Sequence, residues 1–148
     1  EVPYEVFLKY KDRLPDNFRK RAEHFYSEVK RVEEGVAAYK SGDIERFGQL
    51  VTESGYSSIN NWETGSPELI KLYEILKSCK GVYGTRFSGA GFKGCCFAII
   101  NPEYEEEIRE QITEKYLNMF PEYKNSFGIY YCDTYDGCDT SKKKVLER

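Results

Sequence analysis

The chain has 148 residues, of which 40% are hydrophobic and 32% are charged, and its formal net charge at pH 7 is −3. This length suits one domain with a core of its own, and the slightly acidic balance argues against a nucleic-acid partner. No apolar run approaches the roughly 20 residues that cross a bilayer, so we expect no membrane segment. Because the chain begins with Glu1 and not with methionine, we interpret it as a fragment or a processed piece.

The cysteines and the histidine suggest no metal chemistry. Five cysteines, an odd number in a chain without secretory features, indicate reduced thiols in a reducing compartment, and we predict a cytoplasmic protein. Adjacent Cys95 and Cys96 point to opposite faces of a strand, so we predict small buried hydrophobic residues and no metal site. His24 has no Ser or Cys partner at a recognisable spacing, which favours a packing or surface role over catalysis.

Two antiparallel helices are predicted in the first half, after a short helical or irregular lead-in over residues 1–14. Apolar residues recur over residues 16–39 at alternating spacings of three and four, which predicts one stripe along a helix. The members of this stripe are Ala22, Phe25, Val29, Val32, Val36 and Tyr39. Ser41-Gly42 ends the helix, and Asp43 caps the next one. The buried face predicted for that second helix consists of Ile44, Phe47, Leu50 and Val51.

The segment SGYSSINNWETG, residues 54–65, is predicted to be a polar loop. Asn60, Asn61 and Trp62 could form the wall of a site, because amides bind sugar hydroxyls and an indole stacks on a sugar ring. The alternative is a turn whose side chains bond only to one another. Ser66 and Pro67 then open a third helix that ends by Gly81.

The second half is predicted to contain a β-hairpin, a helix and one more strand. Strand formers at residues 82–87 and an apolar run at 95–100 flank a glycine-rich loop. Asn101 and Pro102 start a helix that reaches about Met119. The acidic residues that follow Pro102 are stabilised by the positive N-terminal end of the helix dipole, so we do not assign them to a metal site. Phe127–Cys132 is predicted to be a strand, and residues 134–148 a flexible tail.

The hairpin loop has the form G-x-G-x-x-G, but its context excludes the usual meanings of that pattern. A dinucleotide site needs a helix directly after the loop, whereas a strand follows here. No Lys-Ser or Lys-Thr pair completes a Walker A loop, and no HRD or DFG sequence completes a protein kinase. Glycines let backbone N–H groups point at an anion, and Lys93 would add charge. The alternative is a loop that only reverses the chain.

Several segments resemble one family of sugar kinases. GVYGTRFSGAGFKGCC, at residues 81–96, resembles the third conserved motif of the GHMP kinases, in their galactokinase and galacturonokinase branch. Residues 21–35 and 41–76 resemble the preceding parts of those enzymes in the same order, and the resemblance covers about residues 1–133. Galactokinases have Ser-His where this chain has Ser54-Gly55, and an all-glycine loop where it has Ala90 and Lys93. These departures favour the galacturonokinase-like branch.

The resemblance implies a fold for residues 1–133. It is the ferredoxin-like C-terminal domain of a GHMP kinase, an α+β domain in which helices cover one face of a small antiparallel sheet. A further strand is then expected at or before residue 1. The resemblance also implies that a loop near nucleotide and substrate is formed by Ser88, Gly89, Ala90, Gly91, Phe92, Lys93 and Gly94.

The resemblance further implies a sugar-1-kinase that transfers phosphate from ATP to galacturonate or a related sugar. In such enzymes the serine-rich phosphate loop and the catalytic aspartate belong to an N-terminal domain, which is then this domain's partner and binds most of the ATP and Mg. We therefore assign no catalytic residue to residues 1–148 and expect them to be inactive alone. The alternative is a non-catalytic relative that binds a sugar or nucleotide for regulation. Lys93 is a candidate to bind a uronate carboxylate, with ATP phosphate or solvent as alternatives.

Overall fold

The computed structural model describes residues 2–133, and the tail predicted at residues 134–148 lies outside the described residues. The fold is α+β, as predicted, and its sheet is one antiparallel hairpin. The elements in chain order are α1 (Tyr4–Tyr10), α2 (Asp16–Ser41), α3 (Ile44–Asn60), α4 (Pro67–Ser78), β1 (Val82–Phe87), β2 (Cys96–Ile100) and α5 (Glu105–Met119). Short 3-10 turns stand at Lys11–Arg13, Pro102–Tyr104 and Pro121–Tyr123.

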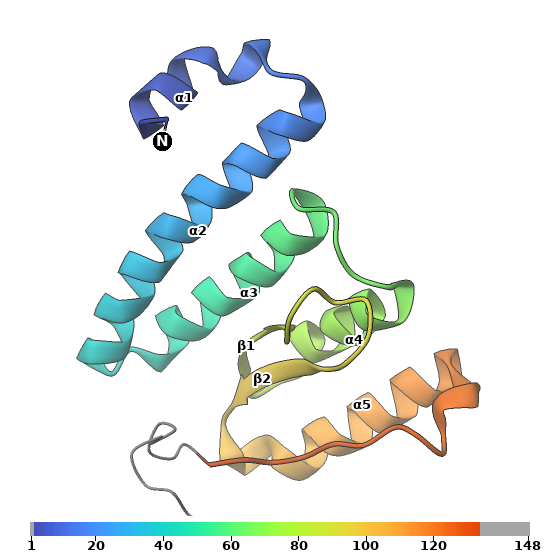
Figure 1. Cartoon of the computed structure of the whole chain (residues 1–148). Coiled ribbons are helices and arrows are strands. Elements are labelled where there is room, and N and C mark those ends of the chain that lie inside the picture. The colour runs from blue at the N-terminus through green and yellow to red at the C-terminus, as the bar shows by residue number, and fades with distance from the viewer. Residues whose placement is uncertain (1, 134–148) are drawn as a thin grey trace, which may run out of the picture.

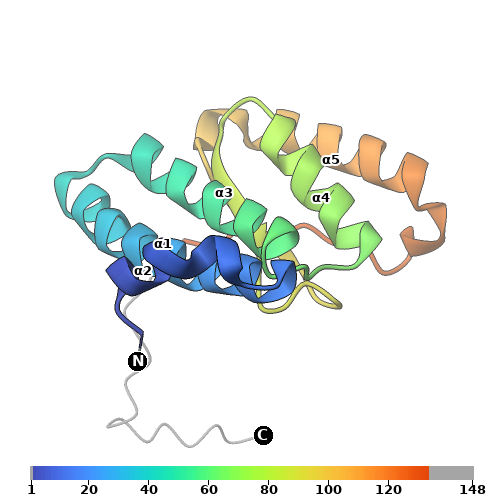
Figure 2. The same cartoon turned by 90° about the horizontal axis from the view of Figure 1, so that it is seen from above.

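Helices α4 and α5 cover one face of the hairpin, while α2 and α3 run antiparallel on the other side of β1 (Figure 1). Viewed from above, the molecule divides into a group formed by α1, α2 and α3 and a group formed by α4 and α5 (Figure 2). Most of the core lies in the second group. Its buried residues are Ile75, Leu76, Cys79, Ile108, Ile112 and Tyr116, and the strands add Val82, Cys96, Ala98 and Ile100.

Helix α3 covers the outer edge of β1 at very short range. The backbone N–H of Thr85 donates to the Thr52 hydroxyl at 3.1 Å, so the edge finds a partner on the helix. A Cβ atom added to Gly48 would lie 2.3 Å from the Tyr83 carbonyl oxygen, and one added to Gly84 would lie 2.0 Å from the Gly48 carbonyl oxygen. Only glycine at both positions permits this approach.

The predicted helix starts are confirmed by their caps. The Asp43 carboxylate accepts the Arg46 N–H at 2.9 Å, and the Ser66 hydroxyl accepts the Leu69 N–H at 3.3 Å. Gly42 ends α2 in the left-handed conformation, with φ of 74°, as a C-terminal glycine does. None of the helices within residues 2–133 is both long and apolar enough to cross a membrane.

The loop predicted from Ser54 is wrong in its first half, because α3 continues to Asn60. Small polar residues in this stretch pack tightly instead of forming turns. The Ser58 hydroxyl donates to the Ser54 carbonyl one helical turn earlier, at 2.9 Å. Gly55 is required where the helix passes β1, since an added Cβ would lie 2.7 Å from the Tyr73 ring and 3.2 Å from the Thr85 oxygen. Tertiary packing therefore outweighs the turn propensity of these residues.

The strand predicted at Phe127–Cys132 is also wrong. This segment runs extended beside α5 (Figure 1), and no strand within residues 2–133 pairs with it. It is held by side chains: Phe127 and Ile129 pack on the core, and the Tyr131 hydroxyl donates to the Glu105 carbonyl at 2.9 Å. The apolar pattern predicted contact with the core correctly, but a strand also needs a neighbour for its backbone.

The predicted faces of α2 and β2 need correction at single residues. The stripe on α2 exists, but most of its side chains are exposed. On α3, Leu50 is buried as predicted, whereas Ile44 is exposed. Cys95 is exposed, contrary to the prediction of a buried residue, and lies just before β2. Cys96 packs against the core, and burial raises the pKa of its thiol to about 12.

Candidate functional site

The glycine loop at residues 88–94 joins the two strands and protrudes from the end of the hairpin. Three of its residues are in the left-handed region, with φ of 81° at Gly89, 78° at Gly91 and 115° at Gly94. The side chains of Phe92 and Lys93 are exposed. No helix follows the loop, so the helix N-terminus that a dinucleotide site requires is missing at this place.

The loop is held at its base and at its middle. The Ser88 N–H donates to the Cys95 carbonyl at 2.9 Å and closes the base. The Gly91 carbonyl accepts the Ser66 N–H at 2.7 Å, which ties the loop to the start of α4. Gly91 is buried against Phe87, and an added Cβ would lie 2.4 Å from that ring. Within residues 2–133, the backbone N–H groups of residues 89–94 have no backbone acceptor. A glycine loop whose N–H groups have no backbone acceptor within the described residues and which carries an exposed lysine can bind an anion.

Asn60, Asn61 and Trp62 lie at the C-terminal end of α3, and their polar groups bond within their own surroundings. The Asn60 amide donates to the Tyr56 carbonyl and the Asn61 amide to the Ser57 hydroxyl, at 2.9 and 3.2 Å. Trp62 lies beside the His24 ring, with 5.3 Å between centroids. These contacts agree with the self-bonded alternative, and none of them joins the three residues to the glycine loop.

A polar cluster between α2, α3 and β1 was not anticipated from the sequence. The Glu28 carboxylate accepts the Ser54 hydroxyl at 2.6 Å and pairs with Arg31 at 2.6 Å, while Arg86 donates to the Ser54 hydroxyl at 2.5 Å. Burial opposes the charge on Glu28, but the bonds from Ser54 and Arg31 outweigh it and hold the pKa of this carboxyl below its ordinary value.

His24 belongs to the same side of α2. Its Nδ1 lies 2.9 Å from the Ser57 hydroxyl, and burial lowers the pKa of the imidazole. This placement is a packing role, as the sequence predicted. The signal that could have revealed the whole cluster is a second helical stripe, one residue away from the apolar one, at His24, Glu28, Arg31, Gly35 and Ala38.

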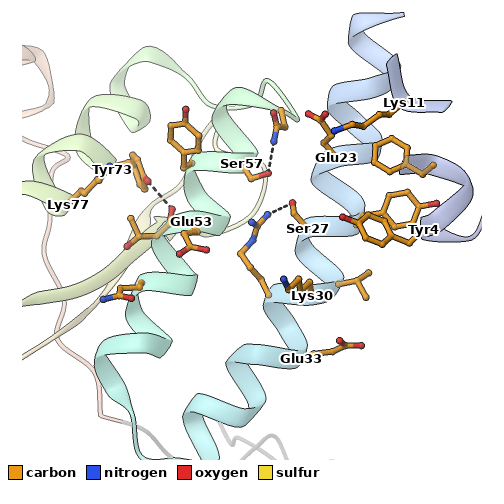
Figure 3. A pocket seen from close by; sticks show the side chains of 18 of the residues that line it. Tyr4, Lys11, Glu23, Ser27, Lys30, Glu33, Glu53, Ser57, Tyr73 and Lys77 are labelled. Carbon is orange, nitrogen blue, oxygen red and sulfur yellow. Dashed lines mark hydrogen bonds between the residues drawn. The ribbon is translucent and has the colours of Figure 1, made fainter. Parts of the chain in front are cut away.

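A cavity of about 1170 Å³ is lined by residues of α1, α2, α3, α4 and β1, among them Tyr4, Ser27, Ser57 and Tyr73 (Figure 3). Charged side chains line its rim, among them Glu23, Lys30, Glu53 and Lys77. Of the residues predicted to form a site, only Asn61 lines it. The cavity is therefore separate from the glycine loop.

Comparison with known proteins identifies the family. Residues 33–118 match the model of the GHMP kinases C terminal family. A galacturonokinase from Arabidopsis thaliana is 45% identical over 127 residues, which are 86% of this chain and 30% of that protein. A galactokinase from Roseiflexus sp. (strain RS-1) is 31% identical over 137 residues, 93% of this chain and 34% of that protein.

The fold comparison agrees with the sequence comparison. The crystal structure of Lactococcus lactis galactokinase complexed with galactose superposes with a TM-score of 0.74 at 28% identity. The match covers 81% of this chain and 31% of that one, so this chain spans about a third of its relatives. The family match covers more than half of the chain and includes α3, α4, the hairpin and its loop, so this chain belongs to the GHMP kinase family and corresponds to its C-terminal domain.

Proposed function

We propose that the full-length protein is an ATP-dependent sugar-1-kinase that acts on galacturonate or a related sugar. The observation that carries this proposal is the loop at residues 88–94, whose N–H groups at 89–94 have no backbone acceptor within residues 2–133 and which carries the exposed Lys93. The 45% identity to a galacturonokinase supports the choice of substrate class.

In this reaction the anomeric oxygen of the sugar forms a bond to the γ-phosphorus of ATP while the bond to ADP breaks. The proton of the hydroxyl passes to a base outside residues 1–148. ATP supplies the phosphoryl group, and the loop's contribution is binding: its N–H groups donate to anionic oxygens and its glycines permit close approach. Mg, which one or two carboxylates and the phosphates of a nucleotide hold in such enzymes, is assigned in this proposal mainly to the polypeptide outside residues 1–148, as the likeness to sugar kinases implies.

The proposal is tested by assaying the full-length protein with ATP against galacturonate, galactose and other hexoses. We expect a sugar 1-phosphate as product, with galacturonate the preferred substrate, detected by phosphorus NMR. Absence of turnover on every sugar would reject the kinase. Calorimetric binding of a sugar without turnover would then favour the non-catalytic relative.

Lys93 is proposed to bind the carboxylate that distinguishes galacturonate from galactose. A charge-assisted hydrogen bond to that group is worth roughly 1.5–3 kcal/mol, so Lys93→Gly in the full-length enzyme should reduce kcat/KM for galacturonate about tenfold or more. The same change should leave galactose nearly unaffected. Lys124→Gly, an exposed lysine beyond α5, is the matched control. Equal losses on both sugars would point to ATP phosphate, and no loss would leave Lys93 in solvent.

A further inference from the structure

Helix α2 carries two lengthwise stripes that lie one residue apart. The inner stripe, His24, Glu28, Arg31, Gly35 and Ala38, faces α3: Glu28 bonds to Ser54, and Ala38 is 6% exposed. The outer stripe is apolar and is defined here as Phe18, Phe25, Val29, Val32, Val36 and Tyr39. Their exposed fractions are 62%, 60%, 46%, 64%, 50% and 71% in that order. The helix thus turns the polar side chains of His24, Glu28 and Arg31 inward and leaves an apolar stripe exposed, unlike an ordinary surface helix.

The inner contacts prevent α2 from rotating to bury the outer stripe. Neighbouring residues on a helix are about 100° apart, so a rotation that buried Val32 fully would withdraw Glu28 from Ser54 and His24 from Ser57. Charged groups would then lose their partners in a partly buried site. This loss costs more free energy than leaving the valines exposed to solvent. The outward face is a fixed property of this fold.

A groove continues the outer stripe toward the sheet. A cavity of about 350 Å³ is lined by Val32, Val36 and Tyr39 of α2 together with Phe47, Leu50 and Val51 of α3. The charged groups on its wall include Arg86, which is already paired with Glu28 and bonded to Ser54. Glu28 and Arg31 on the same wall pair with each other, whereas Lys40 at the groove forms no ion pair within residues 2–133. The rest of the lining is mainly apolar, so the groove offers an apolar surface to an incoming segment. A contiguous apolar surface of this kind marks an interface.

We infer that the outer stripe and its groove are an internal interface, covered in the full-length protein by the polypeptide outside residues 1–148. This inference rests on the proposed function, because it takes that protein to be a complete kinase. The relatives support this occupant: the chain spans 30% of the galacturonokinase and 34% of the galactokinase, so two thirds of each relative has no counterpart here. A second copy of this chain is the competing occupant.

Thiol labelling of the native full-length protein tests the inference. Val36→Cys and Val32→Cys place a small thiol in the stripe, and Ala37→Cys places one on the neighbouring residue, which is exposed and lines neither cavity. We expect both stripe variants to be modified at least tenfold more slowly than Ala37→Cys. Peptide mass spectrometry separates these sites from the exposed Cys95 and Cys132.

Equal labelling rates at Val36→Cys and Ala37→Cys would overturn the inference. So would protection that disappears on dilution, because that would identify a second copy as the occupant. Radical footprinting of the unmodified protein needs no substitution and guards against variants that fail to fold: Phe25 and Tyr39 should react at least tenfold more slowly in the native state than in urea. Labelling does not depend on turnover, so an active enzyme with an open stripe would contradict only this inference.

Discussion

One carboxylate, that of Glu28, joins three elements that are far apart in sequence. It lies on α2, accepts a hydrogen bond from Ser54 on α3, and stands 3.8 Å from Arg86 on β1. The carboxylate is mostly shielded from solvent, with 25% of its side chain exposed. Removing its charge would leave two arginines with an incomplete set of partners, which is why this residue should matter more than the ion pairs on the surface.

We predict that Glu28→Gln lowers the free energy of unfolding at pH 7 by about 1.5–3 kcal/mol, the usual value of a hydrogen bond to a charged group. The pKa of Glu28 is lowered in the folded state, so its contribution is complete above the ordinary value of 4.5 and is lost as the pH falls through the folded-state pKa. Thermal unfolding from pH 7 to pH 3 should show the variant and the wild type converging.

The control is Glu33→Gln, because Glu33 is exposed on the same helix and forms no ion pair within the described residues. It should change the stability by less than about 0.5 kcal/mol at any pH. Equal losses for the two variants would show that the network around Ser54 contributes nothing.

At the scale of elements, the contact between α3 and β1 depends on the absence of side chains. We predict that Gly48→Ala destabilises the protein by about 1–3 kcal/mol or more, because the methyl group would lie 2.3 Å from a backbone oxygen that cannot move without disturbing β1. Gly35→Ala on α2 is the matched control. Its methyl would meet only the Phe47 ring at 3.7 Å, and the helix propensity of alanine should leave stability unchanged or raise it.

Urea unfolding of the two variants measures this difference. If Gly48→Ala unfolds at the same urea concentration as Gly35→Ala, the close approach of α3 to β1 is not what the protein requires. A loss of stability in Gly48→Ala with an unchanged m-value would confirm that the folded contact is the origin of the effect.

Most helices and the hairpin could be predicted from periodicity and caps, whereas the end of α3, the segment Phe127–Cys132 and the exposed face of α2 could not. The spacing of three and four over residues 16–39 identified a helix, yet the stripe that it marked points outward and a neighbouring polar stripe faces α3. Gly55 and the serines around it suggested a loop because turn propensity is local, whereas the Tyr73 ring and the Thr85 carbonyl that crowd position 55 are distant in sequence.

The candidate site was predictable to a similar extent. The glycine loop was placed correctly between two strands, because a run of strand-forming residues lies on each side of the glycines in the sequence. Its attachment to α4 through Ser66 and Gly91 was not foreseen, and neither was the cluster around Glu28. Both join residues from separate elements, and such contacts leave no regular spacing.

At the scale of the whole molecule, residues 2–133 provide a loop that can bind an anion, and no group of three or more His, Cys, Asp or Glu among them is placed to hold a metal ion. We predict that the purified 148-residue chain produces no ADP above background with ATP, Mg and galacturonate or galactose, in an assay where the full-length enzyme is active. Loss of the groups that hold phosphate and activate the hydroxyl should cost far more than a single contact. Clear sugar-dependent turnover by the chain alone would show that the active site lies within it.

The hairpin has one closed edge and one open edge. Helix α3 covers β1, whose Thr85 N–H already has its acceptor, while within residues 2–133 no strand pairs with the outer side of β2. The sheet can therefore grow in only one direction. If two partly folded copies met during synthesis or heating, their β2 strands could form backbone hydrogen bonds with each other. Association would stop at a pair, because α3 blocks each β1 edge.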